Sequence, residues 1–195
     1  MEAAPKKIGE WVYQSKIDDW HGIVHVPTSL IWNQDGKPSS IAEKFVAALA
    51  ILKSKRFAFE WLDVGLMNNR HDMMRGCILV FDYIPTAGCN HPFSERRKLL
   101  ELHFEILPFA TELLNCGGGR VMEPVHDRVF LINQLAPRSD QEVLALYKLL
   151  QAQNRIIGKK FYEGLVAKRI DKPYPLQLRK PKEPTPWMMK HRFDQ

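Results

Sequence analysis

Lys16 is the first residue of the chain whose neighbours suggest covalent chemistry. It opens the segment Lys-Ile-Asp-Asp-Trp-His at 16–21, two residues before an acid. A lysine amine is a nucleophile only after it has lost its proton, and cationic neighbours and partial burial promote that loss. Taken alone the segment is a weak signal, because an exposed lysine beside acidic residues is more common than a catalytic one. It predicts a nucleophile only together with charged segments elsewhere.

The positive charge of the chain is concentrated towards the C-terminus. Residues 155–195 hold 11 basic and 4 acidic residues, whereas the net charge of the whole chain is +6. A basic surplus in one part of a chain suggests a bound anion, and nucleic acid and nucleotide phosphates are the candidates. A solvated basic surface without a ligand is the competing interpretation, and charge alone does not separate the two.

The helices that must position these residues can be predicted from capping residues and apolar periodicity. Ser40 and Ser139 each begin a Ser-x-x-Glu capping box, which predicts a helix start. We expect the first helix to end near Lys53 and the second near Gln153, with another over Ser94–Leu102. Helices and strands mix without a regular strand-helix-strand rhythm, which favours an α+β fold with mostly antiparallel sheets.

Strands are predicted where β-branched and aromatic residues cluster. The segment Trp11–Trp32 reads as strands interrupted near Asp18 and at Pro27. Five prolines in 172–186 predict an extended surface loop. The glycine run at 117–119 lacks the lysine and hydroxyl residue of a P-loop, so phosphate binding there is a weak prediction. Further strands are expected at Phe57–Met67, Cys77–Tyr83, Ile106–Phe109, Gly164–Arg169 and Trp187–Phe193.

Four charged segments, taken in order, resemble the adenylation domain of ATP-dependent DNA ligases, a branch of the covalent nucleotidyltransferases that includes mRNA capping enzymes. Residues 163–168 (Glu-Gly-Leu-Val-Ala-Lys) match the family's EGxVxK motif in full. Lys16 and Asp18 fall on its KxDGxR motif. The aromatic-Asp motif falls on Phe81, Asp82, Pro92 and Arg96, and the last motif falls on Trp187, Lys190 and Arg192, with one extra residue before Lys190.

The resemblance covers about residues 11–193, and the order of the four motifs makes it specific. It implies a single adenylation domain over residues 1–195 with a ligase-type, ATP-grasp-like α+β fold. The expected architecture is mostly antiparallel sheets flanked by helices. About 195 residues leave no room for the OB-fold that usually follows. The sequence is then a shortened form of a longer ligase, a minimal nucleotidyltransferase, or a domain that a separate OB-fold or other accessory subunit completes as a partner.

The resemblance also implies a reaction. The Lys16 amine would attack the α-phosphorus of ATP, pyrophosphate would leave, and AMP would stay on the lysine. AMP would then pass to a 5′-phosphate end of nucleic acid, with nicked DNA as the expected substrate. Fixed cations suit the developing charge, and carboxylates suit Mg²⁺. The implied catalytic residues are Lys16, Lys190 and Arg192; the nucleotide-binding residues are Gln14, Ile17, Asp18, His21, Gln34, Phe81, Glu163, Lys168 and Lys190; the metal ligands are Glu163 and Asp82.

Four positions depart from the family pattern. Asp19 replaces a glycine, and His21 replaces an arginine and so exchanges a permanent charge for a titratable one. Gln34 replaces another arginine. Gly65 stands where the family has a carboxylate that contacts ribose or metal. Glu60 and Asp63 are the nearby candidates to replace that carboxylate. These changes affect phosphate and ribose contacts but spare the nucleophile.

Two alternative functions remain at this point. One is an RNA ligase or a guanylyltransferase that uses GTP, and the other is a degenerate fold kept as a nucleic-acid-binding module. The individual residues have simpler interpretations too: Phe81 as a core residue, Asp82 as a turn cap, and Glu163, Lys190 and Arg192 as solvated charges.

Composition excludes several classes of protein. No apolar stretch approaches the ~18 residues of a membrane helix, and the N-terminus does not read as a secretory signal, so we expect a cytoplasmic protein with no membrane partner. Three cysteines without CxxC spacing argue against a disulfide framework and a cysteine zinc site.

Overall fold

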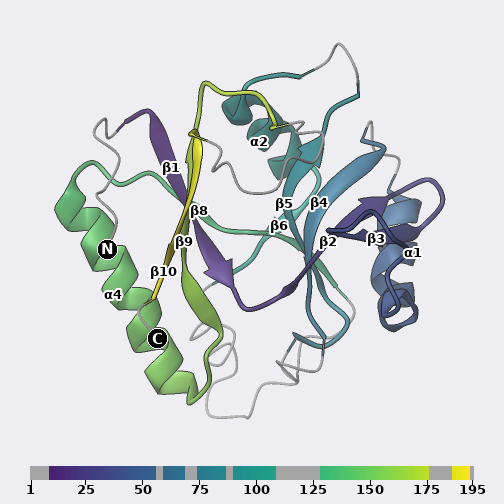
Figure 1. The fold of residues 1–195 in the computed structure, drawn as a ribbon, viewed down its shortest axis with the longest axis horizontal. Helices are drawn as coiled ribbons and strands as arrows, with labels where there is room; N and C mark the ends of the chain where they lie inside the picture. Colours follow the sequence, from purple (N-terminus) through teal and green to yellow (C-terminus); the bar gives the residue numbers. More distant parts are fainter. Residues whose placement is uncertain are drawn as a thin grey trace.

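The computed structural model describes residues 9–55, 59–68, 74–86, 90–108, 128–175 and 186–193. In these residues the chain forms two sheets that stand side by side, with helices on their outer sides (Figure 1). This is the expected α+β architecture with mostly antiparallel sheets. The glycine run at 117–119 and residues 176–185 of the proline-rich segment lie outside the described residues.

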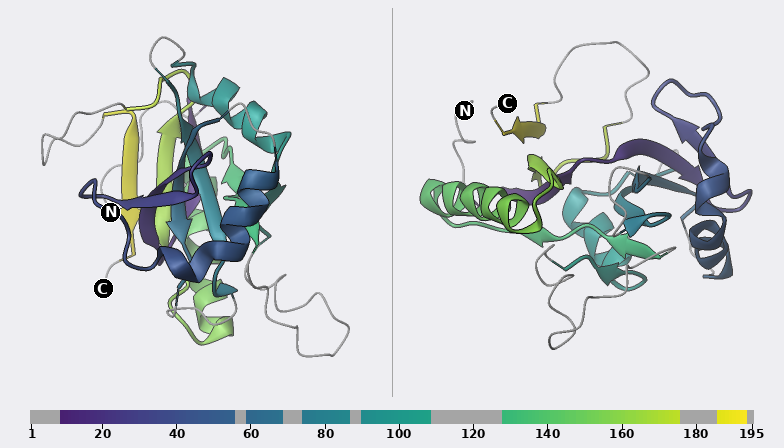
Figure 2. Two further views of the ribbon diagram at one scale, coloured as in Figure 1. Left: turned by 90° about the vertical axis from the view of Figure 1, so that its right-hand side faces the viewer. Right: turned by 90° about the horizontal axis from the view of Figure 1, so that it is seen from below.

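The four-stranded sheet is antiparallel and has the strand order β10-β9-β1-β8. Its long strands are β1 (Trp11–Ile17) and β9 (Tyr162–Arg169), which pair along most of their length. The short strand β8 (Gln134–Leu135) forms one edge and β10 (Met188–Arg192) the other, as Figure 2 shows.

The six-stranded sheet has the order β3-β2-β4-β5-β7-β6. Only the pairs β5–β7 and β6–β7 are parallel. The sheet is connected to the four-stranded sheet where β1 ends at Ile17 and β2 begins at Trp20, so this turn carries the chain from one sheet to the other. Its strands are β2 (Trp20–His25), β3 (Leu30–Asn33), β4 (Trp61–Leu66), β5 (Ile78–Ile84), β6 (Glu105–Ile106) and β7 (Val129–Leu131).

The buried apolar side chains form two clusters, one on the six-stranded sheet and one that joins β1 and β9 to residues of the six-stranded sheet such as Leu79 and Phe130. The 3-10 turn η1 (Ala42–Phe45) and helix α1 (Val46–Ser54) bury Phe45 and Leu52 against the six-stranded sheet. Helix α4 (Asp140–Ile157) covers the four-stranded sheet, with Leu150 in the second core. Helix α2 (Phe93–Glu101) packs beside β5.

The predicted elements are confirmed, with differences at their ends. The capping box at Ser139 forms, because the Glu142 N–H donates to the Ser139 hydroxyl over 3.2 Å. The helix ends at Gly158 in the left-handed conformation (φ 64°), past the expected end at Gln153. The capping box at Ser40 does not form, because a 3-10 turn begins there first and its N-cap, Ile41, makes no side-chain capping bond.

Two strand predictions also shift. The strand expected over Phe57–Met67 begins at Trp61, and the one expected over Ile106–Phe109 is the two-residue strand β6. No helix among the described residues is both long and apolar enough to cross a membrane.

Candidate active site

The inner face of the four-stranded sheet gathers most of the predicted site residues. Residues paired across neighbouring antiparallel strands point to the same side of a sheet. Gln14 pairs with Val166, which pairs with Lys190, and Lys16 pairs with Gly164, which pairs with Arg192. The alternate residues of β1 and β9, among them Tyr13, Leu165 and Ala167, belong to the core under α4, so the polar set faces the six-stranded sheet.

A β-bulge directs Glu163 towards Lys16. Lys16 pairs with Gly164 and Ile17 with Tyr162, so Glu163 is the extra residue of β9. Bulges re-aim a side chain locally. The Lys16 Nζ donates to Glu163 Oε2, and the two side chains are 15% and 22% exposed. Burial raises the pKa of Glu163, but the hydrogen bond and charge of Lys16 outweigh it, with help from the charge of Arg192, and the pKa falls below its usual value.

A second bulge displaces Phe81 on β5. Asp63 pairs with Asp82 and Val64 with Val80, which leaves Phe81 as the extra residue. Its carbonyl accepts hydrogen bonds from Gln14 Nε2 over 3.3 Å and from Lys168 Nζ over 3.2 Å. Both donors come from the four-stranded sheet, so the two sheets are joined at this point. The half-buried ring of Phe81 lies next to Gly65.

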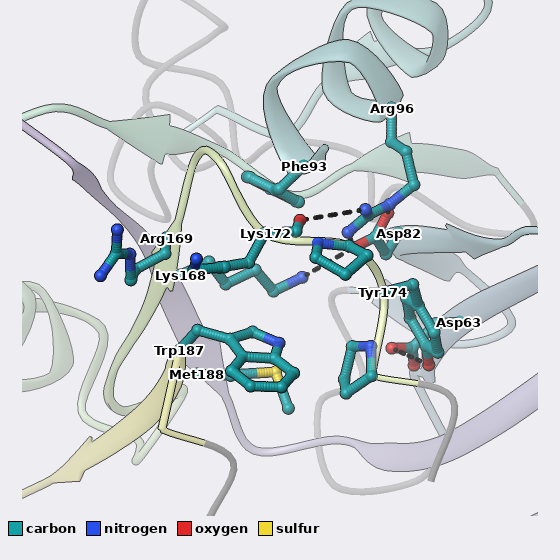
Figure 3. Close-up of a pocket in the computed structure, with 12 residues that line it drawn as sticks. Asp63, Asp82, Phe93, Arg96, Lys168, Arg169, Lys172, Tyr174, Trp187 and Met188 are labelled. Atoms are coloured by element: carbon teal, nitrogen blue, oxygen red, sulfur yellow. Dashed lines mark hydrogen bonds and ion pairs between the residues drawn. The ribbon is translucent and has the colours of Figure 1, made fainter. Parts of the chain in front are cut away.

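Behind this junction lies a buried ion network, drawn in Figure 3. Arg96 from α2 donates to both oxygens of Asp82, over 2.9 and 2.8 Å, and both side chains are 2% exposed. Lys168 Nζ lies 3.6 Å from Asp82 Oδ2 and 4.8 Å from the centre of the Phe93 ring. Burial lowers the pKa of Lys168, against the raising effect of Asp82.

A third group of contacts holds the carboxylate of Asp63. His21 Nε2 donates to Asp63 Oδ1 over 2.7 Å, and the Tyr174 hydroxyl donates to Oδ2 over 3.0 Å. The hydrogen bond to Asp63 raises the pKa of His21 despite burial. Burial raises the pKa of Asp63, but the hydrogen bond and charge of His21, with Lys168, bring it below its usual value. Each side chain of this pair therefore favours the charged form of the other.

Asp19 lies in the turn between β1 and β2, directly beside Gly65. Burial is the largest influence and raises the pKa of Asp19 to about 7. The charges of Lys16 and His21 oppose this effect, while Asp63 and Glu163 add to it. All four charged groups therefore lie close enough to Asp19 to act on its charge.

The structure brings together Gln14, Lys16, Glu163, Lys168, Lys190 and Arg192 on one sheet face, with His21, Phe81 and Asp82 opposite. Three predicted nucleotide-binding residues lie elsewhere. Ile17 is buried in the core, and the backbone N–H of Asp18 donates to Phe161 O over 2.9 Å. Gln34 lies in the exposed turn after β3.

Two polar residues at the site carry no family motif. The sequence gives no indication that the side chains of Tyr174 and Asp19 lie near the other site residues; the folded structure shows it. The signal for Tyr174 is its place between two prolines, because Pro173 and Pro175 fix the extended backbone that turns the ring inward. Tyr174 lines one pocket with Trp187 and Met188 (Figure 3).

The two predicted metal ligands, Asp82 and Glu163, differ in the hydrogen bonds that their carboxylate oxygens accept. Both oxygens of Asp82 accept from Arg96. Glu163 opens towards the space between the sheets and keeps one carboxylate oxygen beyond its lysine contact. Among the described residues no group of three or more His, Cys, Asp or Glu side chains stands close enough to hold a metal ion.

Solved structures of DNA ligases share this fold. The ligase domain of M. tuberculosis LigD is similar with a TM-score of 0.58 and 16% identity, over 95% of this chain and 54% of that one. A Lig E DNA ligase gives a TM-score of 0.54 and 12% identity, over 95% and 63%. A mycobacterial DNA ligase D complexed with ATP gives 0.55 and 16%, over 95% and 55%.

The chain thus spans between half and two thirds of each of these structures. No family model matches the sequence, and no curated protein matches it. At 12–16% sequence identity, this similarity establishes the fold alone. The residues of the inner sheet face are therefore compared with the family only through the motifs that the sequence itself shows. The chain has the fold of the nucleotidyltransferase domains of DNA ligases.

Proposed function

We propose that this chain is an ATP-dependent adenylyltransferase of the DNA ligase type, with Lys16 as the residue that carries AMP. The observation that supports this most directly is the contact between Lys16 and Glu163 at a β-bulge, with Arg192 next to Glu163 and Lys190 two residues along the same face. A partly buried lysine among fixed cations and one carboxylate is the arrangement that nucleophilic attack on a phosphate requires.

The proposed step makes one bond and breaks one. Lys16 Nζ passes a proton to the Glu163 carboxylate, which accepts its hydrogen bond, and attacks the α-phosphorus of ATP, so that an N–P bond forms and the nitrogen releases a second proton to solvent. The bond between the α-phosphorus and the bridging oxygen breaks, and that oxygen leaves with pyrophosphate. Lys190 and Arg192, both exposed on β10, stabilise the charge on the phosphate oxygens. Glu163 holds the Lys16 amine in place before attack.

The base would bind against Phe81. The bulge leaves this ring partly exposed between the sheets, and its carbonyl fixes the amide of Gln14 nearby. An aromatic face stacks on any base, whereas an amide side chain can read a base edge. Gln14 is 2% exposed, so a hydrogen bond from it would be made in a desolvated place. We expect adenine on Phe81 with Gln14 at its edge.

Mg²⁺ is expected with ATP, and Glu163 fits it. When bound it would neutralise charge on the phosphate oxygens. Mg²⁺ is commonly held by one or two carboxylates together with substrate phosphates, which agrees with a site of few protein ligands. Asp82 stays a prediction as a second ligand, although Arg96 already occupies both of its oxygens.

The partner in the second step would be nucleic acid, with nicked DNA as our proposal. AMP would pass from Lys16 to a 5′-phosphate, and a neighbouring 3′-hydroxyl would then close the nick and release AMP. Binding would depend on the basic residues of 155–195 and should weaken steeply with salt. A separate OB-fold or other subunit would supply further contacts.

Intact-mass measurement after incubation with ATP and Mg²⁺ tests the proposal. The wild-type protein should gain the mass of one AMP, and Lys16→Ala should gain none. Lys53→Ala removes an exposed lysine of α1 and serves as the matched control, which should be labelled as well as the wild type. A label that persists in Lys16→Ala would place the nucleophile elsewhere and refute the assignment.

A binding module without catalysis is the second candidate. The replacement of an arginine by His21 and of a carboxylate by Gly65 favours it, because both change the surroundings of the phosphate and ribose. It predicts salt-sensitive nucleic-acid binding with no covalent adduct. The same incubation with GTP in place of ATP separates a guanylyltransferase from both.

A further inference from the structure

The departures at positions 19 and 65 meet at one point of the folded chain. A Cβ atom placed on Gly65 would overlap the Asp19 carboxylate and would lie 2.6 Å from Phe81 Cζ. Asp19 comes from the turn between the two sheets, whereas Gly65 lies on β4. The carboxylate thus fills the space left by the missing side chain. A larger residue at 65 would require the Asp19 carboxylate and the Phe81 ring to move.

The carboxylate also lies near both groups that would hold the ends of a nucleoside monophosphate, Lys16 and Phe81. Asp19 follows Lys16 by three residues and lies close enough for the Lys16 charge to act on it. On its other side the edge of Phe81 borders the same small space at Gly65. If the base stacks on Phe81 and the α-phosphorus reaches Lys16, the ribose must lie between them, because it joins base to phosphate.

We propose that Asp19 is a specificity-determining residue that accepts a hydrogen bond from a ribose hydroxyl of the nucleotide, and that Gly65 is required because it leaves the space for this carboxylate. The inference rests on the proposed function. It also explains how a chain without a carboxylate at position 65 can have one in the same place, from Asp19 in the turn between β1 and β2.

The surroundings of Asp19 suit a ligand that donates a hydrogen bond. Lys16 on β1 and His21 on β2 bring positive charge, and Asp63 on β4 and Glu163 on β9 bring negative charge. Burial raises the pKa of Asp19 to about 7, so its charge is easily displaced by what binds beside it. A hydroxyl that donates to the carboxylate favours the ionised form. A bound ribose hydroxyl would therefore donate a hydrogen bond to the partly buried Asp19 carboxylate.

The test compares the affinity for ATP with the affinities for 2′-deoxy-ATP and 3′-deoxy-ATP, measured by calorimetry on the full chain. A hydrogen bond to a charged group contributes about tenfold or more in affinity. We expect the wild type to bind ATP about tenfold more tightly than at least one deoxy analogue. Asp19→Gly should lower that preference to below about twofold. Asp35→Gly, an exposed acid in the turn after β3, should leave it unchanged.

A cycle at position 65 tests the spatial part without any nucleotide. Gly65→Ala should lower the melting temperature of the wild type, and the loss should be smaller in the Asp19→Gly background, because the overlap with the carboxylate is gone and only the contact with Phe81 Cζ remains. An equal loss in both backgrounds would overturn the inference. So would an Asp19→Gly protein that keeps the full preference for ATP.

The outcomes also separate the two proposals. If the wild type forms a lysyl-AMP adduct and Asp19→Gly keeps the ATP preference, the inference fails and the proposed function stands. If the preference is lost in Asp19→Gly but no adduct forms in the wild type, the inference stands and the covalent step fails. A wild type that binds neither ATP nor its analogues overturns both.

Discussion

The pair Asp82–Arg96 offers a direct test of how the site is held together. Arg96 donates to both carboxylate oxygens over 2.9 and 2.8 Å, both side chains are 2% exposed, and Lys168 lies 3.6 Å away. Asp82→Asn keeps the size of the side chain but removes its charge. Two cations, Arg96 and Lys168, then lose the carboxylate that they share, and Asp63 is the anion that still acts on Lys168.

The expected loss follows from that burial. Breaking a buried ion pair by removing one partner costs about 3–5 kcal/mol. In a domain of this size each kcal/mol changes the melting temperature by about 2–4 °C, so Asp82→Asn should lower it by roughly 6–20 °C. Urea unfolding followed by circular dichroism measures the free energy. Asp82→Asn/Arg96→Met should lose less than the sum of the two single variants, because the second change removes one uncompensated charge.

Glu105→Gln is the matched control for Asp82→Asn. Glu105 pairs with Arg128 over 2.8 Å, but these side chains are 60% and 54% exposed. An exposed pair is worth less than about 1 kcal/mol. An Asp82→Asn protein as stable as Glu105→Gln would show that the network of Asp82, Arg96 and Lys168 is solvated. It would contradict the argument that a buried ion network lies behind Phe81.

Two more predictions concern the pKa of Asp19 and the backbone at Gly164. The pKa of Asp19 is about 7 when folded, above its usual 3.8, so the folded state holds a proton that the unfolded state has lost between these pH values. The contribution of Asp19 to the free energy of unfolding is therefore full below about pH 4 and is lost as the pH rises to 7. Between these pH values the stability of Asp19→Asn relative to the wild type should increase by up to about 1.4 kcal/mol per pH unit, measured by urea unfolding. Gly164→Ala should destabilise by more than about 2 kcal/mol in the same assay, because Gly164 has φ 146° and an added Cβ would overlap His191 O on β10. Gly158→Ala, at φ 64° with open space around it, should cost only about 1 kcal/mol, and equal losses would contradict the steric argument.

The sequence predicted β1, β9 and the start of α4 well but misplaced the start of the first helix, for a physical reason. Alternating apolar residues in β1 and β9 reflect a face that must be buried, and the structure buries it under α4. A capping box is a local pattern that competes with other local geometry. At Ser139 the helix forms and the cap closes, but after Ser40 a 3-10 turn starts at Ala42 instead, and the Ile41 N–H donates weakly to Ser39 over 3.5 Å.

The site was predictable where both partners of a contact lie in family motifs, and not where a partner lies outside them. Lys16 and Glu163 were both found from motifs, and they meet. The contact of Tyr174 with Asp63 joins residues 111 positions apart, and neither residue belongs to a motif pattern that would indicate the other. The space between Asp19 and Gly65 likewise depends on how β4 lies against the turn, which no residue pattern reports.

Both bulges follow from a conflict within the strands themselves. In β9 strict alternation would place Glu163 on the same side as Leu165 and Ala167, which are buried in the core. An ionised carboxylate in that core would be strongly unfavourable, since it would have no partner there. The extra residue resolves the conflict by turning Glu163 to the inner face, where Lys16 neutralises it. Gly164 makes the turn possible, because no side chain fits between β9 and β10 at that position. The Glu-Gly pair is thus a single structural device: the glycine permits the backbone distortion that exposes the carboxylate to the lysine.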